Sequence, residues 1–295
     1  MLVKLVWIVV HLSNFCLCKE IIINEAINDI DQEDPRLVQY IKEHLLEPPP
    51  KNPEKLNETV PRHYKGLESY SALVGQYGQP LFLEGLFDRL IDQEEKDRKK
   101  FFIEAGAFDG VTGSNTLRFE LSEDWTGLLV EPHPLSYDAA RSLQRNAWTI
   151  QTCFSVSKSP SEIQFDSYEA GGSVVNPDLD ERPSEILGFP GGVPNSEILK
   201  MQCMPFYSII AALENPKIDF FSLDIDGVDL QVLETIPWHL VDISVLEIET
   251  AALGDVFPGD WDVLATYLND KGYVFYKRLS IDDIFVHKSL IHKLL

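Results

Sequence analysis

Three acidic residues follow the apolar run IDFFSL within six positions, in the sequence Asp224-Ile-Asp226-Gly-Val-Asp229. The run is typical of a buried strand, and a carboxylate at the carboxyl end of such a strand faces the crevice where open α/β sheets bind ligands. Asp224 and Asp226 could there bind a substrate hydroxyl, accept its proton or hold a metal ion. The alternative is an acid-rich helix start, which the helix dipole favours. We take Asp224 and Asp226 as candidate catalytic residues and, because EF-hand spacing is missing, assign no metal site.

A glycine-containing turn follows an earlier apolar run and has the pattern Glu104-x-Gly106-x-x-x-Gly110. Neither the dinucleotide fingerprint G-x-G-x-x-G nor a P-loop is present. Glu131 ends the next apolar run, about 20 residues further on, an offset at which a carboxylate can accept ribose hydroxyls. Turn and acid together predict an adenosyl cofactor, and the spacing favours S-adenosylmethionine over NAD. Simple turn geometry is the alternative for the two glycines.

Apolar runs and amphipathic stretches alternate from residue 100 onward. The expected strands are residues 100–104, 127–131, 148–154, 218–224, 243–249, 273–278 and 283–287, and the expected helices are residues 114–122, 134–146, 206–214 and 260–271. This alternation predicts an α/β fold with a mostly parallel sheet covered on both faces. The last two strands follow each other closely, which predicts an antiparallel hairpin at the sheet edge.

Further features belong to this part of the chain. Residues 161–167 alternate and predict an extra hairpin arm, whereas residues 170–195, rich in Gly and Pro, predict a long loop. Glu247 and Glu249 end the strand 243–249, and we expect one of them to face the same crevice as Asp224.

The first third of the chain is organised differently. Residues 34–45 have helical spacing after an Asp-Pro start, and residues 79–97 predict a second helix. The proline-rich stretch between them predicts a stiff linker. We therefore divide the chain into residues 1–18, an N-terminal region 19–98 with the helices and linker, and an α/β domain 99–295.

Residues 2–18 are apolar, with one early cation, Lys4, and no acid until Glu20. The pattern is typical of a cleaved signal peptide. An uncleaved signal-anchor, which would associate the chain with a membrane, and a plain buried segment are the alternatives. A signal peptide places the protein in the secretory pathway or outside the cell.

Two of the four cysteines, Cys153 and Cys203, lie beyond the predicted signal. In an oxidising lumen we expect them to form a disulfide, and two free buried thiols are the alternative. Asn57-Glu-Thr is a glycosylation sequon, which has meaning only if this segment is lumenal.

Charge and composition exclude several classes of protein. The chain has 25 Lys and Arg residues against 47 Asp and Glu, a formal charge of −22. Such a surface repels phosphates, so we expect no nucleic-acid partner, and it weakens any attachment to anionic lipid. With 44% hydrophobic residues the chain can form a large core, which excludes a wholly disordered protein.

The sequence EAGAFDG…LLVEPHP…FFSLDIDGVDLQVL resembles FkbM-type S-adenosylmethionine-dependent methyltransferases. The resemblance implies a Rossmann-like methyltransferase fold with a seven-stranded sheet. It also implies a cofactor turn, a ribose-binding acid and an active-site end; in this chain these are Glu104, Gly106 and Gly110, then Glu131, then Asp224 and Asp226. Active family members methylate hydroxyl oxygens on sugars or polyketides, which implies an O-methyltransferase with a small hydroxyl-bearing acceptor.

Further motifs, among them DPRLVQYIKEHL, SNTLRFE and MQCMPFYSII, resemble the Star-like branch of this family over residues 34–290. Star-like proteins regulate epidermal growth factor receptor signalling and help ligand precursors leave the endoplasmic reticulum for the Golgi, endosomes and plasma membrane. This resemblance implies the alternative of a non-catalytic module whose partner is an EGF-like ligand precursor. The usual FkbM pattern D-x-E-G-x-E reads D-x-D-G-x-D here, so the carboxylates of Asp226 and Asp229 reach one methylene less far.

Overall fold

The structure is a computed structural model that describes residues 29–51, 75–92, 95, 97–123, 125–168, 171–179, 183 and 197–295. The predicted signal peptide and the Asn57 sequon lie outside these residues and stay predictions. Among the described residues, no helix combines the length and the apolar character that crossing a membrane requires.

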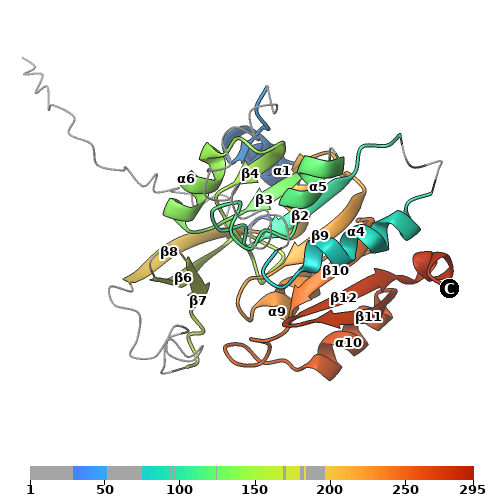
Figure 1. The fold of residues 1–295 in the computed structure, drawn as a ribbon. Coiled ribbons are helices and arrows are strands. Elements are labelled where there is room, and N and C mark those ends of the chain that lie inside the picture. The colour runs from blue at the N-terminus through green and yellow to red at the C-terminus, as the bar shows by residue number, and fades with distance from the viewer. Residues whose placement is uncertain are drawn as a thin grey trace, which may run out of the picture.

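A mixed sheet of eight strands forms the centre of the described structure (Figure 1). Its order is β1 (Leu46–Glu47), β4 (Ala147–Ile150), β3 (Thr126–Val130), β2 (Phe101–Ala105), β9 (Ile218–Leu223), β10 (Ile243–Glu249), β12 (Asp282–His287) and β11 (Tyr273–Leu279). The five strands from β4 to β10 run parallel, and β12 and β11 form the predicted antiparallel hairpin. The α/β fold with seven mostly parallel strands is thus confirmed, and the short β1 adds an eighth.

The strand order reverses beside β2, because the chain runs outward through β3 and β4 and then returns to β9 on the other side. Ligands of open α/β sheets bind at such a switch point, at the carboxyl ends of the strands. The glycine turn after β2 and the acids after β9 therefore meet there.

Helices cover both faces of the sheet because strand side chains alternate between two apolar layers. Phe102 and Phe220 pack beneath α4 (Gln79–Leu90) and α5 (Leu117–Glu123). The neighbouring Ile103 and Phe221 point to the opposite face, where they join the layer of α1 (Pro35–His44), α8 (Phe206–Ala212), α9 (Asp229–Thr235) and α10 (Trp261–Asp270). Both layers are visible in Figure 1.

The first helix shares the core of the α/β domain. Leu37 and Ile41 of α1 are fully buried with Ile209 and Ile210 of α8, and β1 pairs with β4. The described part of the predicted N-terminal region is therefore packed against residues 99–295. The three-part division of the chain remains a prediction.

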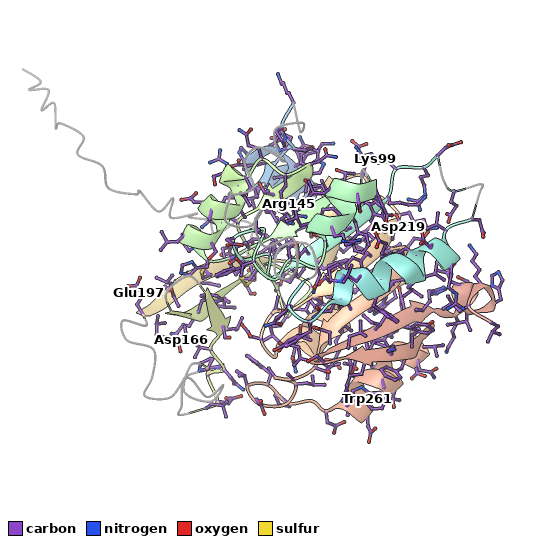
Figure 2. All side chains as sticks on the ribbon, in the orientation of Figure 1. Lys99, Arg145, Asp166, Glu197, Asp219 and Trp261 are labelled. Atoms are coloured by element: carbon purple, nitrogen blue, oxygen red, sulfur yellow. A yellow bond between two sulfur atoms is a disulfide. The ribbon has the colours of Figure 1, made fainter. Side chains whose placement is uncertain are left out.

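A second sheet of four strands lies beside the first, in the order β5 (Cys153–Phe154), β8 (Glu197–Met204), β6 (Ser161–Tyr168) and β7 (Gly171–Val174). In Figure 2 Asp166 and Glu197 mark this sheet, well away from Trp261 of α10. The predicted disulfide is confirmed: Cys153 and Cys203 are bonded and face each other in the pairing of β5 with β8. The predicted arm 161–167 corresponds to β6.

Several predicted boundaries differ from the structure. The helix expected over residues 79–97 ends at Leu90, because Ile91 has an extended conformation. The expected strand 148–154 is divided, because β4 ends at Ile150 and β5 belongs to the second sheet. Part of the expected loop 170–195 is the strand β7, where Gly172 pairs with Ser167 of β6. A Cβ at Gly172 would lie 2.3 Å from the Phe165 ring, so this glycine allows close strand pairing instead of marking a loop.

Candidate active site

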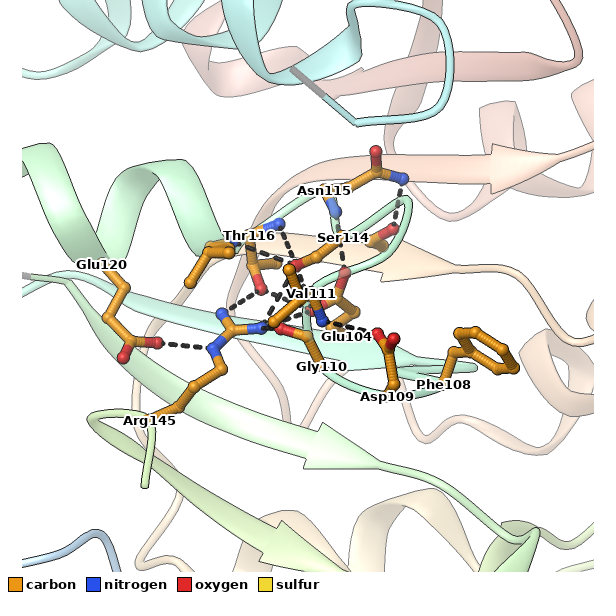
Figure 3. A network of polar contacts seen from close by, with 12 residues as sticks. Glu104, Phe108, Asp109, Gly110, Val111, Ser114, Asn115, Thr116, Glu120 and Arg145 are labelled. Atoms are coloured by element: carbon orange, nitrogen blue, oxygen red, sulfur yellow. Dashed lines mark hydrogen bonds and ion pairs between the residues drawn. The ribbon is translucent and has the colours of Figure 1, made fainter. Parts of the chain in front are cut away.

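Glu104, at the end of β2, holds the glycine turn from beneath (Figure 3). Its Oε1 accepts a hydrogen bond from the backbone N–H of Asn115 at 2.7 Å. Its Oε2 accepts from the hydroxyls of Thr116 at 2.6 Å and Ser114 at 3.0 Å. The structure therefore places Glu104 at the base of the turn, where both of its carboxylate oxygens fix the returning chain.

Arg145 supplies the positive charge for this network and is completely buried. Its guanidinium donates to Glu120 at 2.9 Å and to the carbonyl oxygen of Gly110 at 2.9 Å, and lies 3.3 Å from Glu104 Oε2. Charge-assisted bonds of this kind are the strong ones in proteins. The guanidinium thereby joins β2, α5 and the middle of the glycine turn in one cluster.

The two predicted glycines shape the turn. Gly106 has a φ of +80°, and a Cβ there would lie 1.9 Å from the carbonyl oxygen of Asp224. Gly110 has a φ of +77°, and a Cβ there would lie 3.2 Å from Ala140 in α6 (Pro134–Ser142). Glycine therefore brings the turn into contact with the end of β9 and with α6.

Glu131 follows β3 and is buried, with 6% of its surface exposed. Its carboxylate accepts from the backbone N–H groups of Phe108 at 2.7 Å and His133 at 2.8 Å. Burial raises the pKa of Glu131 to about 8, although both hydrogen bonds oppose the shift. The group thus sits at the switch point with its charge only partly compensated.

Two cavities flank Gly106. The first, of about 150 Å³, has apolar walls of Phe154, Phe165 and Val174 and contains the polar groups of Glu131 and Asp226. The second, of about 390 Å³, is lined by polar residues of the turn and by Ser222 of β9. Ala105, Gly106, Phe108 and Asp224 border both cavities. Glu104, Gly106 and Glu131 of the predicted cofactor residues and both predicted catalytic acids therefore line this region, whereas Gly110 packs against α6 and lines neither cavity.

Asp224, Asp226 and Glu249 each place a carboxylate oxygen within 4.8 Å of the others. Burial raises the pKa of Asp224 well above its usual value, and the charges of Glu249 and Asp226 add to this. Burial likewise raises the pKa of Asp226, and it raises that of Glu249 to about 8. The structure thus brings together the two predicted catalytic residues and one of the two predicted β10 acids.

Asp229 has a different role from Asp224 and Asp226. It is fully buried and accepts a hydrogen bond from the backbone N–H of Gly227 at 3.0 Å. This bond closes the turn in which Asp226 has a φ of +55° and Gly227 one of +92°. Asp229, the first residue of α9, thus holds the turn, while Asp226 lines the cavity.

Glu247 and Glu249 both point to the face of β10 that carries Val245, because residues two apart on a strand share a face. Only one of them was expected to face the crevice. Glu249 joins Asp224 and Asp226, whereas Glu247 lies beside Ser222 in the pairing of β9 with β10.

Other residues of the site are not signalled by the sequence. Arg145 follows a helix and looks like a surface residue, and Asp282 looks like a turn acid, yet Asp282 is buried and accepts from Gln79. His133 is buried, and its Nε2 lies 2.9 Å from the Ser167 hydroxyl of the second sheet. Only tertiary structure brings Arg145 and Asp282 to the site, whereas His133 lies two residues after Glu131 in the sequence.

Residues 104–275 match the family described as the methyltransferase FkbM domain. The chain belongs to this family. The match begins at Glu104 and includes the glycine turn, Glu131 and the acids after β9 and β10. Membership in a methyltransferase family supports the predicted cofactor, S-adenosylmethionine.

Several solved structures also match the chain, all at low identity and low TM-score. The N-terminal domain of EvdMO1 with bound SAH has a TM-score of 0.37 and 12% identity, over 78% of this chain and 96% of that one. Magnesium protoporphyrin IX methyltransferase (ChlM) from Synechocystis PCC 6803 with bound SAH has a TM-score of 0.34 and 12% identity, over 79% and 95%. An O-methyltransferase family protein from Burkholderia thailandensis has a TM-score of 0.32 and 11% identity, over 79% and 69%. No curated protein matches the chain.

We expect the substitution Arg145→Met to lower the free energy of unfolding by about 3–5 kcal/mol, because it leaves Glu104 and Glu120 buried without their cation. Urea unfolding followed by circular dichroism measures this. The control is Arg141→Met, which removes an exposed arginine paired with Glu47 and should change stability by less than about 1 kcal/mol. Equal effects of the two substitutions would contradict the role given to Arg145.

We expect the protein to lose stability as the pH rises from about 4.5 to about 8. The pKa values of Glu131 and Glu249 are about 8 in the folded chain, against 4.5 as the ordinary value. Between these values the unfolded chain binds fewer protons than the folded one, so the free energy of unfolding falls, by at least about 2 kcal/mol. Urea unfolding at pH 5, 6.5 and 8 with a chelator measures it, and Glu249→Gln should flatten the dependence. A rising curve would be inconsistent with these shifts.

Proposed function

We propose that this protein is an S-adenosylmethionine-dependent O-methyltransferase whose acceptor is a small hydroxyl-bearing molecule. The observation that carries the proposal is the buried Glu131 carboxylate, which borders an apolar-walled cavity beside Asp224 and Asp226. A carboxylate next to an apolar slot suits an adenosine, whose ribose offers two hydroxyl donors and whose base has two flat faces that pack against apolar side chains.

The residues present fit this cofactor. Glu131 would accept hydrogen bonds from the ribose hydroxyls, since each of its oxygens has one backbone partner and a further lone pair. Phe154, Phe165 and Val174 would pack against the adenine. The turn from Gly106 to Gly110 would meet the methionyl part, on the side of the larger cavity. When bound, S-adenosylmethionine supplies an electrophilic methyl group.

The chain itself would contribute position and a proton acceptor. Asp226 borders the cavity, and its raised pKa brings it closer to neutrality, where a carboxylate is a better base for a hydroxyl. Asp224 borders the same cavity, and its backbone lies against Gly106 of the glycine turn. Holding the acceptor oxygen in line with the methyl group accounts for most of the rate gain in such transfers.

A non-catalytic, Star-like role in trafficking of an EGF-like ligand precursor is the second candidate. It is favoured by the motif D-x-D-G-x-D, in which Asp226 and Asp229 are shorter than the usual Glu. The carboxylate of Asp229 is already occupied by the turn, which leaves one fewer group for chemistry. This role retains the fold without turnover.

We expect S-adenosylmethionine and S-adenosylhomocysteine to bind the full chain with micromolar affinity, and Glu131→Gln to weaken binding at least about tenfold. The ribose would donate to the ionised form of Glu131, whose pKa is about 8. The affinity of the wild type should therefore rise about tenfold more between pH 7 and pH 9 than the affinity of Glu131→Gln does. Isothermal titration calorimetry measures both. The matched control is Glu162→Gln, an exposed glutamate paired with Lys200.

If neither S-adenosylmethionine nor S-adenosylhomocysteine binds a folded, disulfide-bonded sample, the enzyme proposal is wrong and the role in trafficking becomes the favoured one. Binding that Glu131→Gln retains in full would place the cofactor elsewhere.

We further propose that the protein acts in the secretory pathway or after secretion, and that its N-terminal segment directs it there. The disulfide between Cys153 and Cys203 supports an oxidising compartment. Protein made in secretory cells should then lose mass on glycosidase treatment, and Asn57→Gln should abolish this shift. A signal segment that leaves the chain in the cytosol on cell fractionation would argue against the proposal.

A further inference from the structure

We propose that Asp224, Asp226 and Glu249 bind a divalent cation, Mg²⁺ or Mn²⁺, and that the acceptor hydroxyl coordinates this ion. The site would lie between the ends of β9 and β10, beside the cavity that holds Glu131. The ion site itself rests on the geometry of these three residues, whereas its part in the reaction rests on the proposed methyltransferase function.

The geometry suits one small ion. Each of the three residues offers a carboxylate oxygen, and the three oxygens lie within 4.8 Å of one another. Oxygen ligands of a single Mg²⁺ or Mn²⁺ lie at most about 4–5 Å apart, so small side-chain rotations would complete the coordination. Carboxylates are the ligands that these hard cations prefer.

An independent observation is that the acids of β10 have carboxylate oxygens without partners. Glu249 is 9% exposed, and its Oε2 makes no hydrogen bond. Glu247, 1% exposed and on the same face, has neither oxygen in a hydrogen bond of good geometry. The neighbouring buried acids differ, because Asp229 accepts from Gly227 and Asp282 from Gln79. Buried carboxylate oxygens without donors are costly unless a cation binds them or a proton neutralises them, and Glu249 shares a side-chain hydrogen bond with Asp224.

The charge around the three residues also favours a cation. In the part of the chain that the structure describes, no Lys or Arg forms an ion pair with them. Burial and mutual repulsion raise the pKa values of Asp224 and Glu249. The competing account is that these two carboxyl groups share a proton and bind no metal.

The position of the ion has consequences for the acceptor. Asp224 and Asp226 line the cavity itself, so an acceptor oxygen in that cavity would reach the ion. A hydroxyl bound to a divalent cation has a lowered pKa, and the proton that it releases would pass to solvent water. Asp226 would then act as a ligand and would not need to act as a base. The surrounding carboxylates favour a neutral, sugar-like or polyol acceptor over a phosphorylated or carboxylated one.

The test is a titration of the full chain with Mn²⁺. The decrease in the electron paramagnetic resonance signal of free Mn²⁺ measures how much of the ion is bound. We expect one saturable site, weakened at least about tenfold in Asp226→Asn and in Glu249→Gln. The matched control is Asp282→Asn, which removes a neighbouring buried acid that faces Glu249 but is hydrogen-bonded to Gln79. This control should change the affinity about threefold or less.

Thermal unfolding in the presence of a chelator shows whether a variant has lost its fold or only a metal-coordinating carboxylate. Under these conditions Glu249→Gln should be at least as stable as the wild type, because the substitution relieves repulsion. Added Mn²⁺ should raise the melting temperature of the wild type and of Asp282→Asn more than that of Glu249→Gln. Folded wild-type protein that binds no Mn²⁺, or variants that bind it equally, would overturn the ion site in favour of the shared proton.

Calorimetry with S-adenosylmethionine on the same samples distinguishes this inference from the proposed function. Cofactor binding without Mn²⁺ binding overturns the ion site alone. Mn²⁺ binding without cofactor binding supports the ion site and contradicts the proposed methyltransferase function. When both bind, Mn²⁺ should broaden the proton resonance of the cofactor's sulfonium methyl group, and a sharp resonance would contradict the proposed position of the ion.

Discussion

The buried guanidinium of Arg145 is the interaction on which the site depends. Removing such a charge from water is expensive, and the protein compensates with two carboxylates, Glu104 and Glu120. These come from β2 and α5, and the same arginine also bonds the carbonyl oxygen of Gly110. The glycine turn at the switch point is therefore held by charge-assisted hydrogen bonds as well as by its own backbone.

The other acids on this face of the sheet differ from Glu104 in their charge partners. Glu104, Ser222 and Glu247 stand in one row across β2, β9 and β10, and Glu249 lies one step further along β10. At the β2 end of this row the negative charge meets Arg145. At the β10 end no Lys or Arg of the described residues forms an ion pair with Glu247 or Glu249, and burial raises the pKa of both carboxyl groups. Ion pairs therefore hold the acid at the β2 end in place, whereas the carboxyl groups at the β10 end lie buried without a cation partner among the described residues.

The sequence predicts what depends on local pattern. Apolar runs locate the main strands. Glu104, Gly106 and Glu131 lie near one switch point, because the carboxyl ends of parallel strands meet at one edge of a sheet. The even cysteine pair predicts the disulfide. Arg145, Asp282 and the strand β7 are missed, because their partners are far away in sequence and neither composition nor periodicity reports long-range pairing.

The packing of α1 bears on how the chain is made. Gln32, just before this helix, donates a hydrogen bond to the carbonyl oxygen of Thr235, 203 residues later, and accepts one from the hydroxyl of Ser208. Synthesis proceeds from the amino end, so the apolar side of α1 leaves the ribosome long before α8 and α9 exist to cover it. Contacts of such sequence separation slow folding. The apolar side of α1 therefore stays uncovered during synthesis until α8 and α9 have been made, and uncovered apolar surface of this kind is prone to aggregation.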